Sequence, residues 1–263
     1  MPFTVSHVAA AIPFQRTRLV PSALVIGCMA PDFEYFLRFS PGGTFGHTLL
    51  GIFVLDLPLA LIALWLYHSY AKEPLYTWLP ESMRRRIRLG PTSQPVKDFS
   101  QFALVLLSIL VGMATHILWD SFTHRRFWPY RHWQFLHKKI QLPVYGPLEY
   151  VRVIEHASTV IGALVLLFWF LHWFRKTAPI QPETTQYPHP RKNQRAALFV
   201  VCIVALAAAA LRGFLMYGFG RPLHIGGKFV IEAAIITAIS VFWLEVVVYG
   251  AWRAQLRSEL QDA

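Results

Sequence analysis

The chain has 263 residues, of which 55% are hydrophobic and only 15% carry a formal charge. Together with a mean hydropathy of +0.40, this composition is typical of an integral membrane protein and argues against an ordinary soluble domain. The net charge of +11 does not indicate nucleic-acid binding, because Lys and Arg lie in short loops between apolar runs, where they set topology. We therefore expect the lipid bilayer and anionic lipid headgroups as partners, and no nucleic acid.

Residues 1–46 are the least regular part of the sequence. Five prolines divide this stretch into pieces of about ten residues, which are too short to span roughly 30 Å of hydrocarbon. We predict short interfacial or re-entrant helices here, followed by a turn at residues 41–43.

Five apolar runs follow that are long enough to cross a membrane. They cover residues 47–70, 99–121, 153–174, 196–219 and 228–250. The predicted fold class is all-α, a polytopic integral membrane protein with about five transmembrane helices plus the short amino-terminal helices. We expect residues 1–263 to form a single membrane domain, with an extended, exposed Pro-rich loop before the fourth run.

The loops give a weak signal for orientation. Five spans place the chain ends on opposite faces, with 11 Lys and Arg residues on the amino-terminal face and 13 on the other. By the positive-inside rule this difference favours a cytoplasmic carboxyl terminus. The segment 122–149 interleaves Arg and Lys with Phe, Trp and Tyr, which is typical of chain lying at the headgroup level.

The most informative motif is GMATHILWDSFTH, residues 112–124, at the end of the second predicted span. His116, Asp120 and His124 follow one another at four-residue intervals and so share one helix face. Ionisable groups in a membrane are costly and usually serve a function. Because eight residues separate the two histidines by about 12 Å along a helix, both cannot easily bind one metal ion. Either one pair chelates and the third residue has another role, or the helix breaks between Asp120 and His124.

Further polar residues are predicted to gather at the same end of the spans. The candidate metal ligands are His7, Asp32, His47, His116 and Asp120. Around them or at the rim we place His124, His156, Ser158, Arg212 and Glu232, the last two either pairing with each other or joining the site. Histidine and carboxylate ligands suit a divalent transition metal, Zn²⁺, Mn²⁺ or Fe²⁺, which would generate hydroxide from bound water for hydrolysis. The alternative is a hydrogen-bonded polar seam between helices.

Several short motifs are those of a known family. They are MPFTVSH at the amino terminus, LVIGCMAPDFEYF, GHTLLG, THILWDSFTH and EHASTVIG. With these motifs the chain resembles the bacterial membrane proteins catalogued as domain of unknown function 4184, over nearly its whole length. That resemblance implies no particular activity.

A more distant resemblance is to bacterial inner-membrane proteins described as metal-dependent hydrolases. They begin with a Thr-His or Ser-His pair, then carry a Pro-Asp, a His before a span, and a His-rich helix with an embedded Asp. The corresponding residues here are His7, Asp32, His47, His116, Asp120 and His124. The resemblance implies the bacterial inner membrane and hydrolytic chemistry. The general-base glutamate of an HExxH helix has no counterpart in the core, so Glu155 and Glu34 are the catalytic candidates.

The leading hypothesis is therefore a membrane-embedded, metal-dependent hydrolase acting at the headgroup level on a lipid or lipid-linked phosphoester or ester. The alternative is a non-enzymatic membrane protein, either a transporter or channel or a structural assembly factor, that uses the same residues as a polar seam or ion path. A conduit should also place polar groups through the midplane of the membrane, where Asp56 is the main one.

Overall fold

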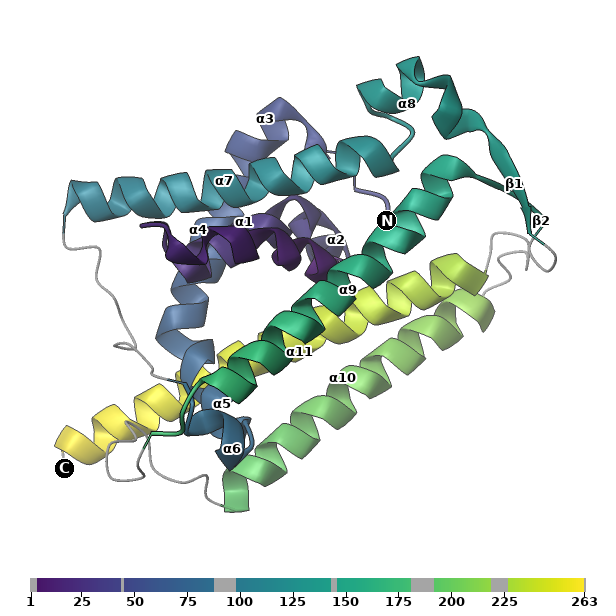
Figure 1. Cartoon of the computed structure of the whole chain (residues 1–263). Helices are drawn as coiled ribbons and strands as arrows, with labels where there is room; N and C mark the ends of the chain where they lie inside the picture. Colours follow the sequence, from purple (N-terminus) through teal and green to yellow (C-terminus); the bar gives the residue numbers. More distant parts are fainter. Residues whose placement is uncertain are drawn as a thin grey trace. The chain divides into compact units, whose positions relative to one another are not determined.

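The computed structural model describes residues 4–43, 45–87, 98–142, 146–180, 192–218 and 227–262. The described chain is almost entirely helical, with one two-stranded sheet (Figure 1). Five helical segments are long and apolar enough to cross a membrane: Leu49–Trp78, Phe99–His132, Tyr150–Lys176, Asn193–Met216 and Phe229–Glu259. The prediction of an all-α polytopic membrane protein is confirmed. Most of the Pro-rich loop lies outside the described residues.

Short helices make up the amino-terminal part, as predicted. They are η1 (Thr4–Arg16), α1 (Pro21–Met29), η2 (Ala30–Asp32), α2 (Phe33–Arg38) and η3 (Phe45–His47). Proline sets the boundaries: Pro21 occupies the first turn of α1, where its missing N–H costs no hydrogen bond and its fixed φ suits a helix. Whether these helices lie at the membrane interface stays a prediction.

The first long span is interrupted twice by π-helical turns. It consists of α3 (Leu49–Gly51), η4 (Ile52–Asp56), α4 (Leu57–Leu66), η5 (Tyr67–Ala71) and α5 (Lys72–Trp78), and α6 (Glu81–Arg84) follows it. The Thr48 side chain caps its start by accepting from the Gly51 N–H. The helix ends at Trp78, eight residues beyond the predicted end at residue 70. The polar residues from Lys72 onward were expected to begin a loop, but they continue the helix.

The second span is the straight helix α7 (Phe99–Thr123), which carries the GMATHILWDSFTH motif. The Asp98 side chain caps it by accepting from the Gln101 N–H at 2.8 Å. The helix ends at His124, whose backbone is extended, with φ −123° and ψ 136°. The structure thus breaks the helix between Asp120 and His124, which was one of the two alternatives drawn from the sequence.

The segment after α7 contains structure that the sequence did not predict. α8 (Trp128–His132) and η6 (Gln134–His137) lead into an antiparallel hairpin of β1 (Lys139–Leu142) and β2 (Gly146–Glu149). Each strand has only four residues, too few for an alternating pattern to stand out from the aromatic and basic background.

The remaining spans are long and continuous. α9 (Tyr150–Lys176) follows the hairpin directly, and α10 (Lys192–Gly218) and α11 (Gly227–Asp262) pack along each other (Figure 1). α11 extends 12 residues beyond the predicted end at residue 250, because its polar carboxyl-terminal residues continue the helix.

The structure divides into two compact units. One comprises Met1–Asp32, Phe45–Ala60 and Val96–Lys176, and the other comprises Phe33–Thr44, Leu61–Pro95 and Thr177–Ala263. We call them unit 1 and unit 2. Unit 1 contains the GMATHILWDSFTH helix and the hairpin, and α10 and α11 belong to unit 2.

Close packing of α1 on α7 forms the centre of unit 1. Gly27 lies against the backbone of Ile109, and Gly112 lies against the backbone of Leu24 and Cys28. A Cβ atom at either glycine would overlap main-chain atoms of the other helix, so only glycine permits this distance. The contact places the end of α1 beside the turn of α7 that follows Gly112.

Candidate metal centre

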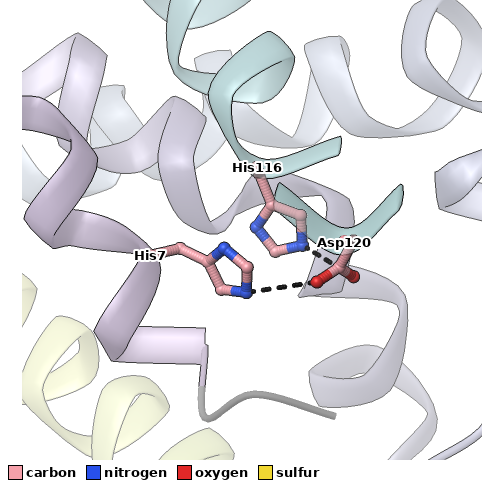
Figure 2. Close-up of side chains that lie close together, drawn as sticks. All are labelled: His7, His116 and Asp120. Carbon is pink, nitrogen blue, oxygen red and sulfur yellow. Dashed lines mark ion pairs between the residues drawn. The ribbon is translucent and has the colours of Figure 1, made fainter. Parts of the chain in front are cut away.

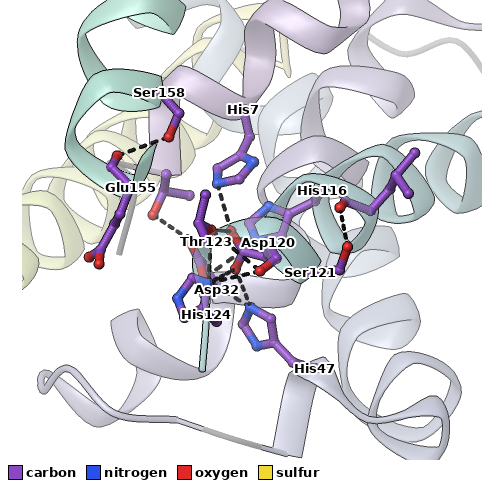
Figure 3. Close-up of polar contacts among 12 residues, drawn as sticks. His7, Asp32, His47, His116, Asp120, Ser121, Thr123, His124, Glu155 and Ser158 are labelled. Atoms are coloured by element: carbon purple, nitrogen blue, oxygen red, sulfur yellow. Dashed lines mark hydrogen bonds and ion pairs between the residues drawn. The ribbon is translucent and has the colours of Figure 1, made fainter. Parts of the chain in front are cut away.

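Five residues from four segments of unit 1 converge at one point. His7 comes from η1, Asp32 from η2, His47 from η3, and His116 and Asp120 from α7. All five side chains are buried. We call these residues the His/Asp cluster. They are the five ligands proposed from the sequence, and the structure brings all of them together (Figure 3).

Asp120 is the hub of the cluster. Its Oδ1 lies 3.4 Å from His7 Nε2, and its Oδ2 lies 3.3 Å from His47 Nε2 and 3.5 Å from His116 Nε2. Figure 2 shows His7 and His116 approaching different oxygens of this carboxylate. The stacked rings of His7 and His116, with centroids 3.8 Å apart, bring their Nε2 atoms to the same side.

Asp32 faces the histidines of the cluster through a single oxygen. Its Oδ1 lies 3.6 Å from His47 Nε2 and 3.7 Å from His116 Nε2. The other oxygen, Oδ2, accepts a hydrogen bond of 2.6 Å from the Thr4 hydroxyl. Thr4 therefore fixes the rotation of this carboxylate and leaves Oδ1 directed at the histidines.

A backbone contact fixes the proton of His116. Its Nδ1 lies 2.7 Å from the carbonyl oxygen of Cys28, and since a carbonyl oxygen only accepts, Nδ1–H is the donor. In the neutral ring, Nε2 then carries the lone pair and points at both aspartates. Histidines that bind metals are held in this way, with the second nitrogen bonded to a carbonyl or carboxylate.

The distances within the cluster are longer than those of most direct hydrogen bonds and leave room for a metal ion between the residues. The five N···O separations run from 3.3 to 3.7 Å, whereas a direct hydrogen bond measures about 2.7–3.2 Å. Four ligand atoms placed tetrahedrally at about 2.05 Å from an ion are about 3.3 Å apart. Two sets of three residues have all their ligand atoms within 4.8 Å of one another: His7, His116 and Asp120, and Asp32, His47 and His116.

Several ligand atoms of the cluster have no hydrogen-bond partner among the described residues. They are His7 Nε2, Asp32 Oδ1, His116 Nε2 and Asp120 Oδ2, all of them buried. An unsatisfied buried polar atom costs about 1–3 kcal/mol, so a group of four is not expected without a compensating ligand. The cluster can therefore hold a metal ion.

Burial also sets the protonation of the two ligands outside the spans. Desolvation, with the neighbouring His116 as a further cause, lowers the pKa of His7 to about 3, so this imidazole is neutral near pH 7 and its lone pair can bind a cation. Desolvation raises the pKa of the Asp32 carboxyl. Positive charge placed beside Asp32 would favour its ionised form.

His124 lies at the edge of the cluster. Its side chain is 17% exposed, and its Nδ1 lies 3.5 Å from Asp120 Oδ2 and 3.0 Å from the Thr123 hydroxyl. Because the helix ends before it, the side chain turns back toward Asp120 instead of lying a further turn along the axis. This geometry fits the rim position assigned from the sequence.

The glutamate and serine candidates on α9 make local contacts. The Glu155 carboxylate is fully buried and accepts a 2.6 Å hydrogen bond from Arg152. Figure 3 shows this carboxylate directed away from the His/Asp cluster. The Ser158 hydroxyl donates to the Glu155 carbonyl, and His156 is exposed. The role of Glu155 as a base stays a prediction.

Three other candidates belong to unit 2, whereas the cluster belongs to unit 1. Glu34 on α2 is buried and forms an ion pair of 2.9 Å with Arg38 one turn later. Arg212 lies on α10 and Glu232 on α11. Their roles around the cluster stay predictions.

Sequence reasoning missed the groups that orient the ligands. The Thr4 hydroxyl and the Cys28 carbonyl lie 28 and 88 positions from the residues they hold. A hydroxyl three residues before a candidate histidine was a weak signal for Thr4. Every residue has a main-chain carbonyl, so the sequence does not show which one accepts from His116.

Asp56, the expected marker of a conduit, lies beside the turn that carries His47, and the conduit stays an alternative prediction. The π-helical turn η4 ends at Asp56, which is fully buried, and a Cβ atom at Gly46 would lie 2.8 Å from its Oδ1. The carboxylate therefore packs against the residue that precedes His47.

Comparisons with known proteins give a family but no activity. Residues 1–251 match the family model described as domain of unknown function 4184. No curated protein and no solved structure matches the chain.

Proposed function

The chain belongs to the family of domain of unknown function 4184, and from this premise we propose that its His/Asp cluster is a metal centre that hydrolyses a lipid or lipid-linked phosphoester or ester. The observation that carries the proposal is the convergence of five buried residues whose facing N and O atoms lie 3.3 to 3.7 Å apart, farther than the roughly 2.7–3.2 Å of a usual direct hydrogen bond.

Charge balance supports a divalent ion. The cluster contains two carboxylates, Asp32 and Asp120, and three histidines, of which His116 has its proton on Nδ1 and so leaves Nε2 available. Two buried negative charges without compensation would be strongly destabilising, and a bound divalent cation would supply that compensation. Imidazole and carboxylate ligands suit Zn²⁺, Mn²⁺ or Fe²⁺.

The chemistry expected of such a centre is hydrolysis by water. A transition metal held by these residues would lower the pKa of its bound water and so supply hydroxide near neutral pH. Hydrolysis would join the water oxygen to phosphorus, or to the carbonyl carbon of an ester, and break the bond from that atom to the leaving oxygen. The leaving oxygen would take up the proton that the water releases. The cluster residues hold the ion, while Thr4 and the Cys28 carbonyl keep Asp32 and His116 oriented.

The segment after His124 supports a substrate at the headgroup level. Trp128 is 60% exposed, Phe135 46% and Trp133 37%, and the two tryptophans pack edge to face. Arg131 and Lys138 interleave with them. Exposed aromatic and basic side chains at the end of a spanning helix are typical of the zone between hydrocarbon and water. The substrate would reach the cluster from this zone.

The cellular setting belongs to the same proposal. We place the protein in the bacterial inner membrane with a cytoplasmic carboxyl terminus, which puts the His/Asp cluster toward the outer face. The excess of Lys and Arg in the loops on the carboxyl-terminal face supports this orientation.

Metal content of the purified chain is the decisive test. The full chain is purified in detergent without chelators, and bound transition metals are measured by mass spectrometry. We expect at least about one ion per chain in the native protein. We expect the metal to be lost in His116→Ala and in Asp120→Ala. His172→Ala is the matched control, because His172 is an exposed histidine on another spanning helix. Absence of metal above background from the native chain would refute the proposal.

Activity is tested on the metal-loaded chain with defined substrates. Mixed micelles containing a phospholipid, a polyprenyl phosphate ester or a carboxylic ester are incubated with the protein, and released phosphate, alcohol or acid is measured. Hydrolysis that requires the metal and disappears in Asp120→Ala supports the hydrolase assignment. Metal binding without hydrolysis of any of these classes would restrict the assignment to metal binding.

A further inference from the structure

We infer that the His/Asp cluster holds two metal ions, bridged by the Asp120 carboxylate, rather than one. The inference rests on the proposed metal centre and concerns how many ions it contains. It follows from which histidine nitrogen lies near which carboxylate oxygen.

The two oxygens of Asp120 serve different partners. Oδ1 faces His7 at 3.4 Å, whereas Oδ2 faces His47 at 3.3 Å and His116 at 3.5 Å. A carboxylate with ligands gathered at both oxygens has the geometry of a bridge between two ions. Figure 2 shows this division between His7 and His116.

The first position has four ligand atoms. Asp32 Oδ1 lies 3.6 Å from His47 Nε2 and 3.7 Å from His116 Nε2, and Asp120 Oδ2 lies 3.3 Å and 3.5 Å from the same two nitrogen atoms. Two imidazoles and two carboxylate oxygens are sufficient for a closed site. This position takes the first ion.

The second position lies between His7 Nε2 and Asp120 Oδ1. His116 is a member of both sets of converging ligands, but it has only one lone pair to offer, because its Nδ1–H is engaged by the Cys28 carbonyl. That lone pair goes to the first ion. The second ion therefore has two protein ligands, completes its coordination with water, and binds more weakly.

A pair of ions changes the expected substrate. Two divalent cations exceed the charge of the two carboxylates and leave the centre positive. Paired ions about 3.5–4 Å apart are a common arrangement for displacement at phosphorus, where they stabilise both the attacking and the leaving oxygen. The inference thus favours a phosphoester over a carboxylic ester.

The test is a titration of the metal-free full chain with Mn²⁺. Ions bound per chain are measured by equilibrium dialysis, and the electron paramagnetic resonance spectrum reports whether the ions are coupled. We expect two ions, the second bound at least about tenfold more weakly, and a spectrum of a coupled pair. In His7→Gln we expect one ion and the spectrum of isolated Mn²⁺, whereas His172→Gln should retain two.

The outcomes separate this inference from the proposed function. One ion in both the native chain and His7→Gln would overturn the second position and leave the metal centre standing. Two ions in both would overturn the assignment of the second position to His7. No bound ion in the native chain would overturn the metal centre itself. If His7→Gln does not fold, the presence or absence of coupling in the native chain still decides.

Discussion

At the scale of single residues, Asp120 organises the site. It lies within 3.5 Å of a nitrogen atom from each of four histidines, His7, His47, His116 and His124. A carboxylate in the interior of a membrane helix is rare, and such residues pair with one another or mark functional sites. Here the surrounding imidazoles and the second carboxylate account for its position.

Thr4 provides the first prediction at this scale. Thr4→Val removes the 2.6 Å hydrogen bond to Asp32 while keeping the shape of the side chain. Because groups that orient ligands tune metal affinity, we expect the affinity of the first ion to fall roughly 10–100-fold. Competition with a chelator of known affinity measures the change. Thr4→Ser retains the hydroxyl and should bind nearly as tightly as the native chain; equal weakening in both variants would argue against the hydrogen bond as the cause.

At the scale of elements, the contact between α1 and α7 holds the cluster in register. Gly27 and Gly112 allow the two backbones to touch. Asp32 follows α1 by three residues, and His116 lies one turn after Gly112, so the same contact sets the distance between the two ligands.

Enlarging Gly112 should therefore affect both stability and the site. In Gly112→Ala the added Cβ overlaps the backbone of α1, and we expect a loss of about 1–3 kcal/mol in stability together with reduced metal affinity. Gly213→Ala on α10 is the control, because its Cβ would lie 3.9 Å from the Val230 side chain, an ordinary van der Waals contact. Thermal unfolding in detergent measures both. If Gly112→Ala changed neither the stability nor the metal affinity, the close contact between α1 and α7 would not be needed for the site.

The aromatic and basic segment after α7 gives a second prediction for an element. Replacing Trp128 and Trp133 by alanine removes exposed aromatic surface and leaves the cluster residues unchanged. We expect hydrolysis of a lipid substrate in vesicles to fall several-fold, while metal content and hydrolysis of a short, water-soluble phosphoester stay unchanged. Parallel assays on the two substrates check this. An equal loss on both substrates would indicate that the tryptophans support the site rather than the lipid.

At the scale of the whole molecule, the two units should respond differently to the metal. The cluster belongs to unit 1, whereas α10 and α11 belong to unit 2. A ligand bound only by the folded state contributes about 2.7 kcal/mol of stability when its concentration is 100 times its Kd. Removal of the metal should therefore lower the stability of unit 1 directly.

Hydrogen exchange can locate this effect. After chelation we expect faster amide exchange in η1, α1 and α7, with little change in α10 and α11. Restoring the metal should restore protection. Uniform acceleration throughout the chain would show that the two units lose stability together.

Topology is the second prediction for the whole molecule. If all five apolar helices cross the membrane, the chain ends lie on opposite faces, and we expect from the loop charges that the carboxyl terminus is cytoplasmic. A fluorescent-protein fusion at the carboxyl terminus should fluoresce, and an alkaline phosphatase fusion there should be inactive. Active phosphatase would reverse the orientation and place the His/Asp cluster toward the cytoplasm.

The sequence by itself determined the fold class and the approximate positions of the five spans. Long apolar runs have few alternatives in a bilayer, where the backbone must satisfy its own hydrogen bonds. The spacing of His116 and Asp120 also follows from helix geometry alone. The sequence likewise identified His7, Asp32 and His47 as candidates, because the predicted spans gather them at the end that carries Asp120 and because a distant resemblance implies them.

Only the tertiary structure decided how these residues meet. The distances around Asp120, the Thr4 contact and the ion pair of Glu155 with Arg152 depend on side-chain directions. The Cys28 carbonyl that orients His116 depends on how α1 packs against α7. Helical periodicity is local and can be recognised in a single segment, whereas contacts between residues far apart in the chain depend on how closely the segments pack. Packing between segments therefore sets the distances on which the proposed metal centre depends.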